Sequence, residues 1–169
     1  TLGFGVGTLL VLRTASWKLF ILGLGGILAG YLYTGGPAPV AYYPFGELLV
    51  FTAMGPALVM GSYFTQTGSI SVLSLILSLP VGFLVAAILH VNNVRDIDFD
   101  MQFGRKTMPI LIGRPLARHE YAFMTIGSYL VVVFLVATGS LTPWALLPLV
   151  TLPLLLRPMQ TIYSTEEVI

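Results

Sequence analysis

Three of the seven acidic residues in this sequence lie within five positions, at Asp96, Asp98 and Asp100. They directly follow a long apolar run. If the helix formed by that run continues, Asn92, Asp96 and Asp100 recur every four residues and share one face, while Asp98 lies about 200° around the helix from Asp96. Mg²⁺ takes one or two protein carboxylates and completes its shell with substrate phosphates. The spacing therefore predicts a magnesium site at Asp96 and Asp100, with Asn92 as a weaker oxygen ligand.

Basic residues surround these acids, and they predict a phosphate ligand. Arg95 precedes Asp96, and Arg105 and Lys106 follow in the run GRKT at 104–107. Guanidinium and ammonium groups suit phosphate oxygens. Acids and bases packed together at the mouth of a membrane helix thus indicate a metal–diphosphate ligand that needs both. The alternative is a solvated loop whose charges only set topology, although acids at a membrane mouth favour function.

The composition indicates the class of protein that must position this motif. Apolar residues make up 56% of the 169 positions and charged residues only 9%, whereas soluble domains carry about a quarter charged residues. Lipid-facing positions must be apolar, so a membrane protein accounts for this composition. A net charge of +1 is too small to indicate nucleic acid as a partner, and the absence of cysteine excludes disulfides and thiol catalysis.

The chain is predicted to be an all-α, polytopic membrane helix bundle forming a single domain over 1–169. A spanning helix needs roughly 20 mostly apolar residues. A first apolar run stops at Arg13 and is interpreted as a partial span. Close helix contacts are expected at Gly23, Gly25, Gly26 and Gly30, and prolines predict a kink in the last span. Five further runs read as full spans: 17–33, 47–64, 70–91, 121–138 and 143–163.

The basic residues predict the orientation of this bundle. The stretch 92–120 holds five of the eight Lys and Arg residues, and helix alternation places Arg157 on the same side. Arg13 and Lys18 fall on the opposite side of the membrane, and these two residues count against the orientation given below. The positive-inside rule places the charged loop in the cytoplasm. We therefore expect an integral protein of the cell (inner) membrane with a cytoplasmic active-site loop.

Several stretches together resemble a known family. The motif NNVRDIDFD at 92–100, followed by GRKT, resembles the second Asp-rich motif of the UbiA superfamily of membrane prenyltransferases. The doubled Asn is similar to the menaquinone branch, the 1,4-dihydroxy-2-naphthoate polyprenyltransferases. That branch is also resembled by YLYTGGP at 31–37, AY at 41–42, FGE at 45–47, GSYFTQTG at 61–68 and SLP at 78–80. Met101 departs from the pattern, because family members usually carry Lys or Arg there.

The resemblance implies a nine-helix bundle around a central cavity, with two facing Asp-rich motifs. This chain would correspond to the end of the third helix through the eighth, truncated at both ends, so we expect the fragment alone to be inactive. The implied reaction is Mg²⁺-dependent transfer of a prenyl group from a polyprenyl diphosphate to an aromatic acceptor. Asp96, Asp100 and Asn92 would then be catalytic, with Asn93, Arg95, Arg105 and Lys106 binding substrate.

Aromatic and polar residues outside the motif complete the expected site. Tyr33, Tyr42 and Tyr63 are candidates to shield an allylic cation by cation–π attraction, against the alternative of an interfacial aromatic belt. His90, in an apolar run, is expected to be a hydrogen-bonded packing residue. Glu47 opens a span, where an acid favours a helix N-terminus, and it belongs to one of the resembling stretches.

Two alternatives remain at this point. The first is another UbiA branch, which makes chlorophyll, tocopherol or archaeal ether lipid. The second is a non-enzymatic, ion-coupled transporter with acidic residues in its path. A strict requirement for Mg²⁺ and a prenyl diphosphate would separate an enzyme from a transporter.

Overall fold

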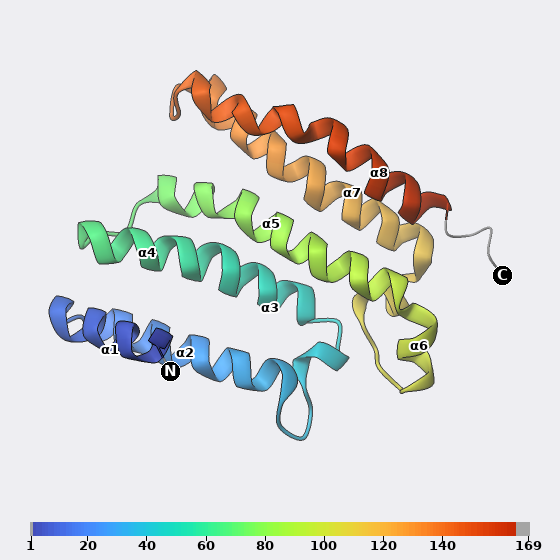
Figure 1. The fold of residues 1–169 in the computed structure, drawn as a ribbon, viewed down its shortest axis with the longest axis horizontal. Coiled ribbons are helices and arrows are strands. Elements are labelled where there is room, and N and C mark those ends of the chain that lie inside the picture. Colours follow the sequence, from blue (N-terminus) through green and yellow to red (C-terminus); the bar gives the residue numbers. More distant parts are fainter. Residues whose placement is uncertain (1, 165–169) are drawn as a thin grey trace.

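The computed structural model describes residues 2–164, and these contain helices and no β-strand (Figure 1). The all-α prediction is confirmed. The polar stretch at 165–167 lies outside the described residues. In chain order the elements are α1 (Leu2–Thr14), α2 (Trp17–Thr34), η1 (Val40–Tyr42), α3 (Gly46–Thr52), η2 (Ala53–Ala57), α4 (Leu58–Thr67), α5 (Val72–Arg95), α6 (Ile97–Gln102), α7 (Met108–Ala137), η3 (Pro143–Thr151) and α8 (Leu152–Ser164).

Four helical segments are long and apolar enough to cross a membrane: Trp17–Thr34, Gly46–Thr67, Val72–Arg95 and Met108–Ala137. The chain is therefore a multi-pass integral membrane protein. The fifth expected span, 143–163, is divided between the 3₁₀ helix η3 and the α-helix α8. Pro148 in η3 lacks the N–H that a continuous α-helix needs, which accounts for the interruption. Pro153 and Pro158 lie inside α8, which continues through both.

Helix α7 begins at Met108, whereas the sequence predicted a loop as far as Glu120 and a span from Tyr121. Pro109 stands in the first turn, where a missing N–H costs nothing. The helix is then interrupted at Gly113, whose φ of 78° and ψ of 159° are not helical. Most of the expected loop is thus helical: it holds the end of α5, all of α6 and the first part of α7, where a turn at 108–112 is joined to the span through a kink at Gly113.

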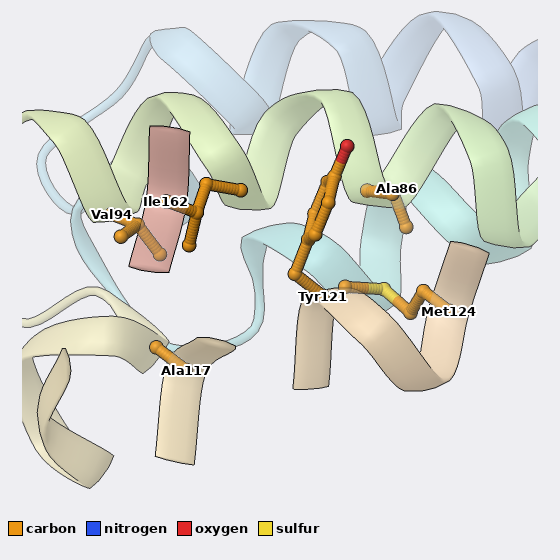
Figure 2. Packing of buried hydrophobic residues seen from close by; sticks show 7 residues of the cluster. Ala86, Val94, Ala117, Tyr121, Met124 and Ile162 are labelled. Atoms are coloured by element: carbon orange, nitrogen blue, oxygen red, sulfur yellow. The ribbon is translucent and has the colours of Figure 1, made fainter. Parts of the chain in front are cut away.

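The core of the bundle lies between α5 and α7. Its buried members are Ala86, Ala87 and Val94 from α5, Ala117, Tyr121 and Met124 from α7, and Ile162 from α8. Figure 2 shows Tyr121 reaching from α7 to α5 beside Ala86. Alanine side chains at this contact let the two helices approach closely, as small residues do in membranes.

A second close contact joins α5 to the segment α3–η2–α4. A Cβ atom on Gly55 would lie 2.8 Å from the Cα atom of Gly82, and one on Gly82 would lie 2.8 Å from the Phe51 ring. Pro56 follows Gly55, and the backbone around both adopts π-helical geometry, a common response to an interrupted hydrogen-bond ladder. By contrast, the contacts predicted for the α2 glycines are not formed within residues 2–164. A Cβ atom on Gly23, Gly25, Gly26 or Gly30 would meet nothing within 4 Å.

Candidate functional site

The charged motif lies where α5 ends, and the helix does not run straight through it. Asp96 has φ −94° and ψ 10°, and it separates α5 from the short α6. The prediction of a single continuous helical face is wrong in this respect. Backbone hydrogen bonds still join Asp96 N to Asn92 O at 3.0 Å and Asp100 N to Asp96 O at 2.8 Å. The four-residue links therefore persist through a bend, which turns α6 away from the axis of α5 (Figure 1).

Each acid of the motif is paired with an arginine. Arg95 donates two hydrogen bonds to Asp96, from Nε at 2.7 Å and from Nη2 at 2.8 Å. Arg105 Nη1 donates to Asp100 Oδ1 at 2.8 Å. Asp98 instead accepts from Arg114 of α7, at 2.7 Å. Asp98 thus differs from the other two acids in having a partner on another helix. The helical spacing had predicted that Asp98 does not share their face.

The two pairs at Asp96 and Asp100 differ in burial. The Asp100 side chain is only 3% exposed, whereas that of Asp96 is 42% exposed. The hydrogen bonds from Arg95 are the largest effect, and they lower the pKa of the Asp96 carboxyl. Burial raises this pKa by less, and the charges of Arg95 and Arg105 lower it further. Asp96 is therefore held in its ionised form, which is the form that binds a cation.

A turn brings Arg105 back to the motif. Gly104 has φ 69°, a value that glycine adopts without strain, and Arg105 N donates to Asp100 O at 3.0 Å. The next residue then contacts the loop after α2, because Lys106 N donates to Tyr42 O at 2.7 Å. The Arg105 guanidinium lies 4.6 Å from the centre of the Tyr42 ring. Two loops far apart in sequence are thereby joined over the end of the bundle; we call residues 95–106 with Tyr42 the charged loop.

Polar side chains from three helices meet in what we call the buried polar cluster: Glu47 of α3, His90 and Asn93 of α5, and Glu120 of α7. Glu47 and His90 are buried, whereas Asn93 is partly buried and the Glu120 side chain is 31% exposed. Asn93 Nδ2 donates to Glu47 Oε1 at 2.8 Å. His90 Nε2 lies 2.8 Å from Ala117 O, and its Nδ1 lies 3.4 Å from Glu47 Oε1 and 4.0 Å from Glu120 Oε2. His90 is a buried, hydrogen-bonded residue, as expected.

The structure thus brings together Arg95, Asp96, Asp100, Arg105 and Tyr42, with Lys106 joined to them through its backbone. Asn93 belongs to the buried polar cluster, and Tyr33 lies beside Gly46, next to Glu47 in the chain. Asn92 is exposed at the end of α5. Tyr63 does not join the others, because it lies near the end of α4 that faces Lys18, at the far end of the bundle from α6 (Figure 1).

Comparison with known proteins identifies the family of this chain. A model of the UbiA prenyltransferase family matches residues 1–167. The chain belongs to this family. It is 41% identical over 162 residues to 1,4-dihydroxy-2-naphthoate octaprenyltransferase of Bacillus subtilis (strain 168), covering 94% of this chain and 51% of that protein. The enzyme of the same name from Mycobacterium leprae (strain TN) is 35% identical over 159 residues, covering 94% and 52% respectively.

A vertebrate relative matches over a smaller share of both chains. UbiA prenyltransferase domain-containing protein 1 of Danio rerio is 36% identical over 136 residues, covering 80% of this chain and 40% of that protein. The chain spans about half the length of the curated relatives it matches. Family membership favours an enzyme over the transporter alternative.

The acids of the charged loop suit Mg²⁺ only in part as a metal site of their own. Within residues 2–164, no three histidine or acidic side chains are grouped closely enough to enclose a metal. Asp96 and Asp100 nevertheless fit an ion that takes one or two carboxylates and fills its remaining positions with phosphate oxygens and water. Their arginine partners are the groups that a diphosphate would attract, so the donor set suits a metal bound together with its substrate.

Sequence reasoning missed part of the site. It assigned no role to Glu120, and it placed Arg114 in the loop without identifying Asp98 as its partner. Partners separated by 46 residues, as in the pair Asn93 and Glu47, leave no local spacing to detect. The available signal was polarity alone: His90 lies within an apolar run, Glu47 begins one and Asn93 follows one. Such residues in membrane helices are rarely without partners.

Proposed function

We propose that the protein carrying this sequence transfers a prenyl group from a polyprenyl diphosphate to 1,4-dihydroxy-2-naphthoate, with Mg²⁺. The observation that supports this most strongly is the charged loop, in which acids suited to a metal are paired with arginines suited to a diphosphate. The names of the relatives from Bacillus and Mycobacterium support the naphthoate acceptor.

The first requirement of this reaction is departure of the diphosphate. Negative charge grows on its bridging oxygen as the allylic C–O bond breaks, so cations aimed at that charge lower the barrier. Arg95 and Arg105 would turn their guanidinium groups from Asp96 and Asp100 to the diphosphate, and Lys106 would add a third cation. Asp96, Asp100 and Asn92 would hold Mg²⁺, which when bound supplies Lewis-acid neutralisation of the leaving group.

The second requirement is a shield for the allylic cation. Tyr42 already has a cation near its ring, because the Arg105 guanidinium lies 4.6 Å from the ring centre. Such a contact contributes about 0.5–2 kcal/mol, depending on its exposure to water. When Arg105 engages the diphosphate, the aromatic surface of Tyr42 becomes available beside the leaving group, with Tyr33 as a second candidate.

The acceptor then attacks through a ring carbon. The new C–C bond forms at the carbon that carries the carboxylate, the bond to that carboxylate breaks, and carbon dioxide leaves with the ring electrons restored. A fused ring with two hydroxyl groups is electron-rich enough for this attack. Its carboxylate resists entry into hydrocarbon, so we infer entry from the aqueous side of the charged loop, which the basic residues place in the cytoplasm.

A panel of acceptors tests this proposal. The complete protein in membrane vesicles, supplied with Mg²⁺ and a long-chain prenyl diphosphate, is expected to convert 1,4-dihydroxy-2-naphthoate and release carbon dioxide. The control panel is 4-hydroxybenzoate, homogentisate and chlorophyllide at equal concentration. A tenfold preference for any of these would contradict the naphthoate assignment and favour another branch of the family.

A further inference from the structure

The buried polar cluster differs in its chemistry from the charged loop above it. It contains no Lys or Arg, and its side chains are two carboxylates, an imidazole and a carboxamide. Glu47 is almost fully buried, with a side chain 7% exposed, and His90 is completely buried. The two carboxylates do not suit phosphate oxygens, because both kinds of group are anionic and accept hydrogen bonds.

The contact with Glu47 determines which end of the Asn93 amide faces other groups. A carboxylate oxygen accepts hydrogen bonds, so the NH₂ end of the amide must turn towards Glu47, as it does at 2.8 Å. The carbonyl oxygen, Oδ1, is then the end that can bind another group. Asn93 therefore presents an acceptor atom, and its ligand must supply a hydrogen or a positive charge.

The cluster also contains a buried acceptor that its own donors do not reach. His90 Nε2 donates to the carbonyl of Ala117, because a carbonyl only accepts. At 3.4 Å, His90 Nδ1 lies within ion-pair distance of Glu47 Oε1 but is not aligned for a hydrogen bond, and Glu47 Oε2 is buried with no partner among the described residues. Unpaired acceptors in a buried site are costly. A ligand with O–H groups would supply what the cluster lacks.

We propose that the buried polar cluster is the subsite for the aromatic acceptor, in which Asn93 Oδ1 accepts a hydrogen bond from a hydroxyl group of that acceptor. Glu47 is a positioning residue, which acts by holding the Asn93 amide in this orientation. The inference rests on the proposed function. It separates the two substrates by their hydrogen-bonding character, with the diphosphate at the charged loop and the hydroxylated ring at the cluster.

The first test measures KM for each substrate in the complete protein in membranes. Asn93→Ala and Glu47→Ala are each expected to raise KM for 1,4-dihydroxy-2-naphthoate about tenfold and KM for the prenyl diphosphate less than about twofold. The double variant should be no worse than Asn93→Ala, because Glu47 acts through Asn93. Glu47→Gln should largely restore the acceptor KM, since its carbonyl still accepts from Asn93. Equal increases for both substrates would overturn the proposal.

Ser78→Ala is the matched control. Ser78 is a buried polar residue of the same helix, and its hydroxyl donates to the backbone of that helix at Leu75 O. Its variant should leave both KM values unchanged. If Glu47→Ala does not accumulate in membranes, Glu47→Gln and Asn93→Ala still decide the question.

The second test identifies the ligand atom with methyl ethers of the acceptor. The unaltered protein should discriminate against one of the two monomethyl ethers, and Asn93→Ala should lose that discrimination. Equal discrimination by both proteins would overturn the proposal. A rise in the Mg²⁺ concentration for half-maximal activity, with an unchanged acceptor KM, would instead assign Oδ1 to the cation. Failure of the unaltered protein to use the naphthoate at all would refute the proposed function, whereas normal turnover with unaffected variants would refute only this inference.

Discussion

The charged loop and the buried polar cluster occupy neighbouring positions on α5 but are assembled in opposite ways. In the charged loop, Asp96 and Asp100 pair with arginines one and five residues away. In the cluster, partners of α5 come from α3 and α7, 46 and 27 residues away. The acid–arginine pairs of the loop can thus form within a short stretch of chain, whereas the cluster exists only when three helices have packed. We expect substitutions in the loop to affect catalysis and diphosphate binding with little effect on folding.

The largest expected effect concerns the acids of the loop. Asp96→Asn and Asp100→Asn should each reduce prenyl transfer on the order of a hundredfold or more, because a neutral amide stabilises a divalent cation and its developing charge poorly. Asp98→Asn should be much milder, since Asp98 is engaged by Arg114 instead. Turnover with Mg²⁺ at matched expression measures this. If Asp98→Asn were as inactive as Asp96→Asn, the separation of the three acids would be wrong.

An intermediate effect is expected for the cations. Arg105→Ala and Lys106→Ala should raise KM for the prenyl diphosphate about tenfold, as expected for loss of a charge-assisted hydrogen bond, with little change for the aromatic acceptor. Arg114→Ala is the control, because it also removes an arginine from a carboxylate but at Asp98. It should change either KM less than about threefold. A similar increase for both substrates in Arg105→Ala would indicate a general structural role.

The smallest expected effect is a shift in pH dependence. Arg95 holds the pKa of Asp96 below its usual value, so the ionised carboxylate persists to lower pH than it otherwise would. In Arg95→Gln the pKa should rise, and the acidic limb of the activity profile should move to higher pH by about one unit or less, given the exposure of this pair. The position of the limb is the measurement, since the maximum also falls when a phosphate ligand is lost. An unmoved limb would show that Asp96 does not determine it.

The comparison also explains what the sequence could predict. Apolar runs and the grouping of Asp96, Asp98 and Asp100 are local patterns, so they correctly indicated a helical membrane protein with a charged segment at the end of α5. The function of that segment stays a prediction. The bend at Asp96 was missed because residues around it have no helix breaker. The start of α7 was missed because Arg114, Arg118 and Glu120 made a helical stretch appear to be a loop. The position of Tyr63 relative to the motif depends on the direction of α4, which its own neighbours do not reveal.

Contacts between helices could not be predicted from one residue alone, because a contact depends on both partners. Gly55 lies against Gly82, and Gly82 lies against the Phe51 ring. A Cβ atom on any of the α2 glycines, by contrast, would meet nothing within 4 Å among residues 2–164. A small side chain permits close approach without specifying its partner. The same reasoning applies to Glu47 and Asn93, whose types indicated a polar contact but whose pairing required the fold.

The bond from Lys106 N to Tyr42 O has a consequence for how this site can change. It joins two loops through main-chain atoms alone, so it survives replacement of either side chain by any residue that keeps its backbone N–H. Tyr42 can therefore be exchanged for another aromatic or aliphatic residue without releasing the loop that carries Arg105. The backbone connection between these two loops is thus independent of the side chains that they carry. Side chains at this site can diverge, or be redesigned for another substrate preference, while the backbone stays the same.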